Sequence, residues 1–250
     1  MQGVAPGARC IKAVLEYDGT RYAGFQSQPN LLTIQGELQR ALSEVTQEEG
    51  KIVAAGRTDA GVHASGQVIH FLTSWKRSLE ELHRAFNALL ASDIAIKEMT
   101  VAPPDFHARF SALTREYRYT ILNQRIRSPL EARYAYHHER HLDTDAMGEA
   151  LECLVGTHDF ASFGQPTQGD STVRDVMRAT CNKDGNHIYI DLTANAFLRH
   201  MARTIVGTLL PVGRGLLPPG DVSAILEAED RSQAGPPAPA HGLCLARVNY

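Results

Sequence analysis

Residues 54–64 read AAGRTDAGVHA, and this stretch fixes the central turn of the fold predicted here. Gly56 and Gly61 flank Asp59, and glycine permits backbone conformations that other residues avoid. We expect a sharp loop that exposes the Asp59 carboxylate beside Arg57, whose permanent positive charge favours the ionised form. Such a carboxylate can act as a nucleophile. An Asx turn between two strands explains the same residues without chemistry, and the residues alone favour that interpretation.

Strands with alternating apolar residues flank this loop, and amphipathic helices and two more strands lie outside them. In chain order the elements are strand 11–17, helix 34–45, strand 51–55, strand 67–72, a helix that begins at the capping box Ser78–Glu81, and strand 94–101. The order β-α-β-β-α-β is that of the ferredoxin-like motif. The loop at Asp59 therefore joins the second and third strands of the first half.

The same order of elements recurs in the second half of the chain. Its elements are strand 115–122, helix 146–154, strands 176–182 and 188–193, helix 198–212 and strand 243–248. Pro103-Pro104 breaks the chain between the halves, so we expect one unit over 1–104 and another over 105–250. A short helix is predicted over 222–228, and 123–141 is predicted to be a long irregular segment. The fold class is α+β, with two ferredoxin-like halves fused around a central mixed or antiparallel sheet.

Composition excludes several classes of protein. The four cysteines are far apart and form no CxxC pair, so neither a zinc knuckle nor a disulfide framework is predicted. The histidines show no ligand spacing and no nucleotide-binding motif is present, so we expect neither a metal nor a cofactor. No apolar run approaches the roughly 20 residues that span a bilayer, and the first residues lack a secretory pattern. We therefore expect a cytoplasmic protein that does not bind membranes.

Arginines are concentrated locally, although the formal net charge of the chain is −3. Residues 105–140 contain seven arginines against four acidic residues, and residues 195–220 contain three arginines and no acidic residue. Arginine suits phosphate because its planar guanidinium donates two parallel hydrogen bonds. A basic surface for a nucleic acid is one interpretation of these counts. Scattered surface arginines explain them equally well.

Seven blocks along nearly the whole chain resemble the tRNA pseudouridine synthase A (TruA) family, in the family's order. They are LEYDGTRYAGFQ at 15–26, GRTDAGVHA at 56–64, DFHARFSA at 105–112, EYRY at 116–119, GTHDFASF at 156–163, FLRHMARTIVG at 197–207 and APAHGLCL at 238–245. The chain departs from the family at Phe25, where Trp is usual, at Ser27, where a basic residue is common, and at Ala91, where proline is frequent.

The resemblance implies an enzyme that isomerises uridine to pseudouridine at positions 38, 39 and 40 of the tRNA anticodon stem-loop. It also implies an RNA-binding cleft and a homodimer whose active-site clefts use both subunits. The reaction breaks the bond from uracil N1 to the ribose and rejoins the base through C5. Since substrate and product contain the same atoms, no redox cofactor or energy source is required. Target bases in or beside a duplex must be flipped out, at a cost of a few kcal/mol each.

The resemblance assigns the catalytic residues by position. Asp59 corresponds to the indispensable aspartate, Tyr117 to the tyrosine that moves a proton and packs against the base, and Arg203 to the partner of the aspartate. The substrate-binding residues it implies are Arg57, Tyr117, Arg109 and Arg199. From pattern alone, the favoured interpretation of Tyr117 is a core tyrosine with a hydrogen-bonded hydroxyl. Helical spacing places Arg203 on one side of a helix, in a stripe with Asn195, Arg199 and Gly207. Because glycine has no side chain, Gly207 would let another segment approach this side closely. A stripe that faces solvent explains the same pattern.

Two other functions compete with this interpretation. A ferredoxin-like module could bind RNA without catalysis, but it would need stacking aromatics in RNP-type runs, and the sequence has none. A glycoside-cleaving enzyme could use Asp59 as its nucleophile, but no second carboxylate has a comparable setting. The route of the isomerisation stays open among attack at C1′, attack at uracil C6 and a glycal intermediate.

Overall fold

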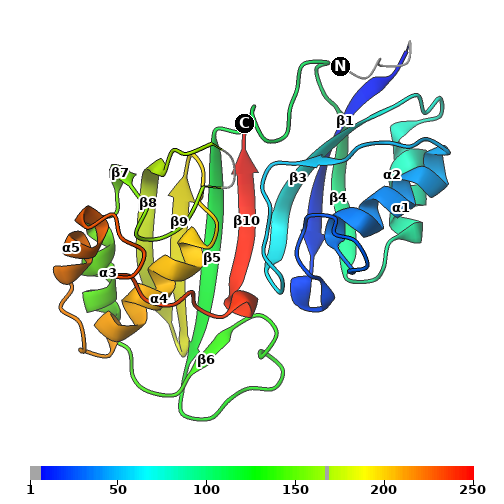
Figure 1. Cartoon of the computed structure of the whole chain (residues 1–250). Helices are drawn as coiled ribbons and strands as arrows, with labels where there is room; N and C mark the ends of the chain where they lie inside the picture. Colours follow the sequence, from blue (N-terminus) through cyan, green and yellow to red (C-terminus); the bar gives the residue numbers. More distant parts are fainter. Residues whose placement is uncertain (1–6, 167–168) are drawn as a thin grey trace. The chain divides into compact units, whose positions relative to one another are not determined.

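The computed structural model describes residues 7–166 and 169–250 (Figure 1). This part of the chain is an α+β protein with ten strands and five α-helices. It forms two compact units. The first unit ends at Leu113 and also takes in Leu245–Tyr250, and the second spans Thr114–Cys244. Within the described residues, none of the helices is long and apolar enough to cross a membrane.

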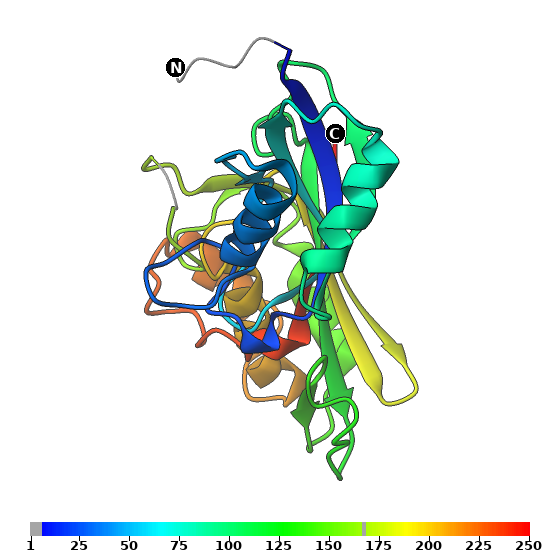
Figure 2. The same ribbon diagram turned by 90° about the vertical axis from the view of Figure 1, so that its right-hand side faces the viewer.

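The first unit has the predicted β-α-β-β-α-β order. Its elements are β1 (Arg9–Tyr17), α1 (Ile34–Thr46), β2 (Val53–Ala54), β3 (His63–Thr73), α2 (Leu79–Leu89) and β4 (Ile94–Val101). β1 lies between β4 and β3 and is antiparallel to both, and β2 is antiparallel to β3. The strand β10 (Leu243–Asn249) lies next to β3. The helices α1 and α2 pack beside one another, as the two views of Figures 1 and 2 show.

Local sequence explains why these elements form where they do. In β1 the alternate residues Ile11, Ala13 and Leu15 are fully buried, which gives the sheet one face toward the helices. The capping box is present, because the Ser78 hydroxyl accepts from the Glu81 backbone N–H and the Glu81 carboxylate accepts from the Ser78 N–H. The predicted strand and helix pattern of the first half is therefore confirmed.

The second unit has the predicted order up to its second helix, with additions, whereas the predicted last strand, 243–248, lies mostly in the first unit. It contains β5 (Thr114–Asn123), β6 (Tyr136–His138), α3 (Thr144–Glu152), β7 (Gly156–Asp159), β8 (Val173–Asp184), β9 (His187–Ala194), α4 (Met201–Gly213) and α5 (Asp221–Glu227). β5, β9, β8 and β7 are neighbours in that order and each pair is antiparallel. The short strand β6 is parallel to β5, within the segment 123–141 that was predicted to be irregular. α3 packs against β8, α4 and α5.

Residues 105–113 lie in the first unit, whereas the sequence placed the division after residue 104. Hydrogen bonds explain this position. The Ala108 N–H donates to His70 Nδ1 at 3.1 Å, and the Leu113 N–H donates to the Asn249 carbonyl at 2.8 Å. Pro103-Pro104 interrupts the strand pattern, but contacts with β3 and with the chain's last residues keep the segment on the first unit.

Candidate active site

Asp59 lies half-buried in the loop between β2 and β3, at the place that the sequence predicts. Backbone and buried side-chain contacts hold the residues on both sides of it. The Phe25 N–H donates to the Thr58 carbonyl at 3.0 Å, and the Tyr17 hydroxyl is 2.8 Å from Thr58 Oγ1. Gln67 Nε2 donates to the Gly56 carbonyl at 2.9 Å. The residue before Asp59 is thus fixed by β1 and by the segment after it.

Gly24 brings its backbone against the Asp59 loop. Its φ is +100°, in the region that favours glycine, and an added Cβ would lie 2.9 Å from the Thr58 carbonyl oxygen. On the other side of Asp59, Gly61 has φ 77° and donates its N–H to the Tyr22 carbonyl at 3.4 Å. The predicted role of Gly61 in a sharp turn is confirmed. Two glycines with positive φ therefore shape the loop, one of them from a different segment.

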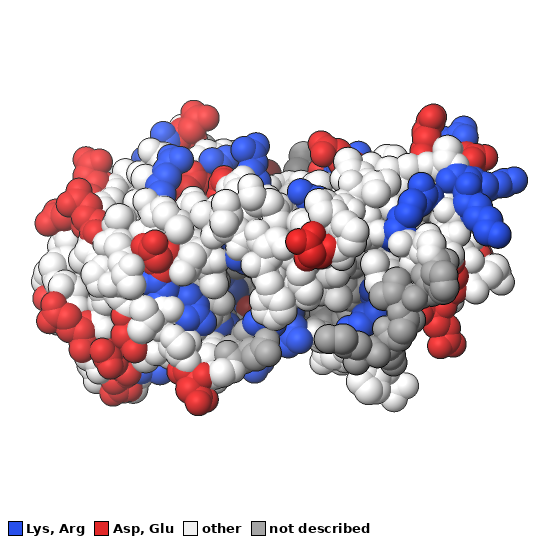
Figure 3. All heavy atoms as spheres, turned by 90° about the horizontal axis from the view of Figure 1, so that it is seen from above, with Lys and Arg blue, Asp and Glu red and all other residues white. Residues whose placement is uncertain are grey.

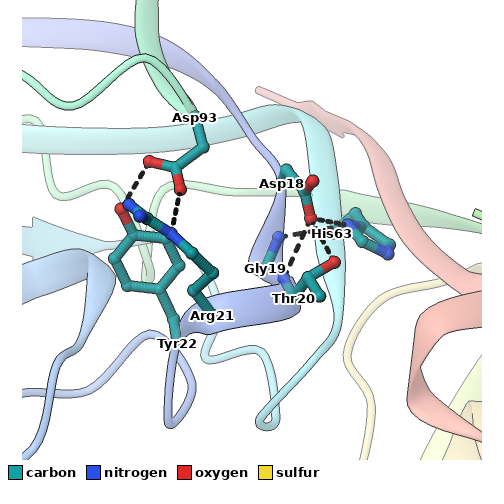
Figure 4. Close-up of polar contacts among 7 residues, drawn as sticks. All are labelled: Asp18, Gly19, Thr20, Arg21, Tyr22, His63 and Asp93. Carbon is teal, nitrogen blue, oxygen red and sulfur yellow. Dashed lines mark hydrogen bonds and ion pairs between the residues drawn. The ribbon is translucent and has the colours of Figure 1, made fainter. Parts of the chain in front are cut away.

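His63, at the start of β3, ties the end of the loop to a short 3-10 helix at Gly19–Arg21 (Figure 4). The Gly19 N–H donates to His63 Nδ1 at 3.1 Å, which requires this nitrogen to be unprotonated. Asp18 Oδ1 accepts from the Thr20 N–H at 2.9 Å and lies 3.2 Å from the same His63 nitrogen. His63 is therefore a buried histidine with a structural role.

Asp93, directly before β4, binds the residues that follow the 3-10 helix start at Gly19 (Figure 4). Its carboxylate accepts from Arg21 Nε at 2.8 Å and from the Tyr22 hydroxyl at 2.6 Å. Burial, together with the hydrogen bond to Asp93, raises the pKa of Tyr22 to about 12, so this hydroxyl stays protonated and keeps donating at neutral pH. Since the Tyr22 carbonyl accepts from Gly61, Asp93 indirectly positions the far side of the Asp59 loop.

The first unit also carries Arg57 and Arg109. Arg57 is exposed in the same loop as Asp59, two residues before it. Arg109 lies in the 105–113 segment, which contacts β3 through His70. His70 is seven residues beyond His63 on β3, about 23 Å at the usual rise of a strand. Arg57 and Asp59 therefore lie in one loop, and Arg109 lies in a turn that contacts β3 at His70, opposite Val53 of β2.

Tyr117 and Arg203 belong to the second unit. Tyr117 is 9% exposed on β5, and its ring packs edge-on against Phe197 with the centroids 4.8 Å apart. Arg203 lies in α4, where its Nε donates to the Ala238 carbonyl at 2.7 Å. Burial raises the pKa of Tyr119, and the positive charge of Arg203 opposes this increase. Tyr119 lies on the same face of β5 as Tyr117, since alternate residues of a strand share a face.

The helical stripe predicted through Asn195, Arg199, Arg203 and Gly207 is correct only in part. The helix begins at Met201, not Leu198, so Asn195 and Arg199 precede it. Arg199 pairs instead with Gln165 in an isolated β-bridge, with its N–H 2.8 Å from the Gln165 carbonyl. Extended pairing at Arg199 prevents the helix from starting earlier, and its exposed side chain does not share a helix face with Arg203.

The close approach predicted at Gly207 is confirmed. A Cβ at this position would collide with the Pro236 carbonyl oxygen, and the Ala238 N–H donates to the Arg203 carbonyl at 2.9 Å. The segment leading to β10 thus runs directly along the Arg203–Gly207 side of α4. It fixes both the backbone and the guanidinium of Arg203.

Several residues that support the Asp59 loop have no role predicted from the sequence. Gly24 lies outside the predicted turns, so only the fold reveals its contact with Thr58. Gln67 was predicted to begin a strand, yet it is fully buried and donates to the loop. A polar residue at a buried position of an apolar strand is the signal that could have marked it.

Comparison with known proteins identifies the family. A family described as "tRNA pseudouridine synthase" matches residues 13–111 and 150–250. The chain is 48% identical over 246 residues to "tRNA pseudouridine synthase A" of Moorella thermoacetica, covering 96% of this chain and 99% of that protein. It is 42% identical over 241 residues to the protein of the same name from Syntrophotalea carbinolica, covering 96% of each. The relative of that name from Chloroflexus aurantiacus is 47% identical over 97% of this chain and 89% of its own length. The chain belongs to the tRNA pseudouridine synthase family.

Proposed function

We propose that this protein isomerises uridine to pseudouridine in tRNA, at positions 38, 39 and 40 of the anticodon stem-loop. The observation that carries the proposal is the family match over both halves of the chain, which includes the Asp59 loop. The anchored geometry of that loop supports the assignment, because a nucleophile must be held in near-attack position. Hydrogen bonds with the buried residues Tyr17 and Tyr22 hold Thr58 and Gly61, and they thereby support Asp59 from both sides.

The reaction that Asp59 would catalyse is balanced without a co-reactant. The N1–C1′ bond breaks and the C5–C1′ bond forms. The proton on C5 leaves, and N1 of the product carries a proton. Asp59 would attack either C1′ or uracil C6, or act as a base in a glycal route. In the two covalent routes, its bond to the substrate breaks again before the product leaves. We assign Asp59 as the catalytic carboxylate in each of these routes.

The remaining roles are proposed from the positions that the family resemblance assigns. Tyr117 would move the proton from C5 or C2′ and pack against the base, for which its position against Phe197 provides a firm aromatic support. Arg203 would pair with Asp59 and orient it. Arg57, exposed beside Asp59, would contact the RNA backbone or take the place of the flipped base.

The distribution of charge supports binding of tRNA despite the net charge of −3. In Figure 3, which views the protein from above, acidic side chains are spread along the margin of the second unit and basic side chains lie among them. Four arginines of the segment 123–141 are exposed: Arg125, Arg127, Arg133 and Arg140. We propose that this segment, with Arg109 and Arg199, contacts the phosphates of the anticodon arm.

We further propose that the protein acts as a homodimer in the cytoplasm. Both statements rest on the family resemblance and on the sequence. Sedimentation of the purified protein at micromolar concentration, with and without tRNA, tests the first of them.

A tRNA transcript labelled with tritium at uridine C5 tests the proposed activity directly. Formation of pseudouridine releases this tritium to water, because C5 loses its hydrogen when it bonds to C1′. We expect release from a transcript with uridines at positions 38, 39 and 40, and none from one with cytidines there. Binding without release would favour the non-catalytic RNA-binding alternative. Release that persists after all three replacements would contradict the proposed positions.

A further inference from the structure

The segment 105–113 forms a fixed turn on the first unit. The Ser111 N–H donates to the His107 carbonyl at 2.9 Å, and the His107 N–H donates to Ser111 Oγ at 3.0 Å. The Tyr250 hydroxyl donates to the Ala108 carbonyl at 2.7 Å, which fastens the turn to the end of the chain. The turn is therefore held at its middle as well as at its ends.

This turn presents an aromatic ring to solvent. Phe110 is 71% exposed, and its ring is stacked on that of His107 with the centroids 4.3 Å apart and the planes at 28°. His107 packs in turn against His70, with the centroids 4.9 Å apart. Its Nδ1 accepts the N–H groups of Arg109 and Phe110, each at 3.2 Å, so the ring cannot rotate freely. The outer ring of this stack thus has a fixed support.

The charged groups around the stack are mainly basic. The Arg109 guanidinium lies 5.7 Å from the centre of the Phe110 ring, and Lys12 Nζ lies 4.2 Å from the centre of the Tyr250 ring. Burial lowers the pKa of His107, a backbone hydrogen bond partly opposes this, and the positive charges of Arg109 and Lys51 lower it further, so His107 is neutral at pH 7. Asp105 is the acidic residue of the same turn. A neutral aromatic stack flanked by cations matches a nucleobase with its phosphate.

We propose that Phe110, stacked on His107, binds an unpaired nucleobase of the tRNA, and that Arg109 contacts the adjacent phosphate. Bases stack on exposed aromatic side chains whatever their sequence, while arginine neutralises the backbone. The stack contacts β3 at His70, which pairs with Val53 of β2, six residues before Asp59, and lies seven residues along β3 from His63. We assign to the stack a base other than the one that is isomerised, because Phe110 lies in a different turn from Asp59. This inference rests on the proposed function, since it names a second contact with the same substrate.

Substitution at Phe110 tests the stack. Phe110→Ala should weaken the affinity for tRNA about tenfold, since stacking of one base typically accounts for a loss of this size. Activity lost at low protein concentration should recover as the protein concentration is raised. Phe110→Trp should keep the affinity, whereas Phe110→Leu, which retains apolar area without a ring, should lose it. Leu216→Ala, at a side chain that is 65% exposed in the second unit, is the matched control and should bind as the wild type.

A photo-crosslinking benzoylphenylalanine at position 110 identifies the occupant. We expect a crosslink to one unpaired nucleotide of the tRNA that is not a target uridine. A crosslink to a second copy of the chain, or unchanged tRNA affinity in Phe110→Ala, would overturn the inference. Absence of pseudouridine in the wild-type reaction would instead overturn the proposed function, so the two failures are distinguishable.

Discussion

The Asp59 loop of the first unit joins the strands β2 and β3, and the segment 123–141 of the second unit connects β5 to α3, yet the two are built in opposite ways. Buried partners such as Tyr17 and Gln67 anchor the Asp59 loop. The segment 123–141 leaves Ile126 76% exposed and Leu130 92% exposed among its arginines. A group that performs chemistry must be held still, whereas a surface that follows a phosphate backbone need only be accessible and charged.

The largest effect is expected from Asp59→Asn, because an amide cannot replace the carboxylate as nucleophile. The substituted protein should fold and bind tRNA as the wild type, since the anchors of the loop lie at other residues. Turnover should be undetectable in the tritium-release reaction. Turnover close to the wild-type rate would remove Asp59 from the chemistry and leave the loop as a structural turn.

The next largest effect is expected from Arg203→Lys. Lysine keeps the charge but loses the guanidinium that donates to the Ala238 carbonyl and, we propose, to Asp59. The single-turnover rate at saturating protein should fall by about a hundredfold, because the carboxylate loses its near-attack geometry. If only the tRNA affinity fell, Arg203 would be an RNA contact and not the partner of the nucleophile.

A smaller effect should follow Gly24→Ala, which tests whether the anchors matter for rate. The added Cβ would press on the Thr58 carbonyl 2.9 Å away, and φ of +100° is unfavourable for alanine. The matched control is Gly185→Ala, where φ is +57° and no atom lies within 4 Å. The control should lose about 1 kcal/mol of unfolding free energy and no activity. Gly24→Ala should lose more stability and about tenfold in single-turnover rate. Equal behaviour of the two variants would show that the contact with the loop is unimportant.

The smallest effect is expected in the segment 123–141. The logarithm of the tRNA affinity should fall linearly with the logarithm of salt concentration, since bound phosphates release counterions. Replacing Arg125 and Arg127 together with glutamine should reduce this slope by about two. The matched control removes the same charge at Arg40 and Lys97, which pair with Glu37 and Glu16. If the control lowered the slope as much, the effect would come from total charge and not from this segment.

The sequence predicts the order of strands and helices well because both halves carry clear periodicity. It predicts the Asp59 loop because two strands with period-two alternation flank it. The strands β6 and β7, of three and four residues, are too short to show a period. The contact of Gly24 with Thr58 and the position of 105–113 depend on contacts distant in the sequence, such as Ala108 with His70. The start of α4 was missed because the bridge of Arg199 with Gln165 has no local signal.

The most direct test titrates protein into labelled tRNA under single-turnover conditions, with Asp59→Asn and the Arg125→Gln/Arg127→Gln double variant side by side. The first should bind tRNA normally at every concentration and release no tritium. The second should need more protein to reach half of its maximal rate, and at saturation it should reach the wild-type rate. A saturating rate that stays low in the double variant, or tRNA affinity that is lost with Asp59→Asn, would contradict the separation of chemistry and binding between these two regions.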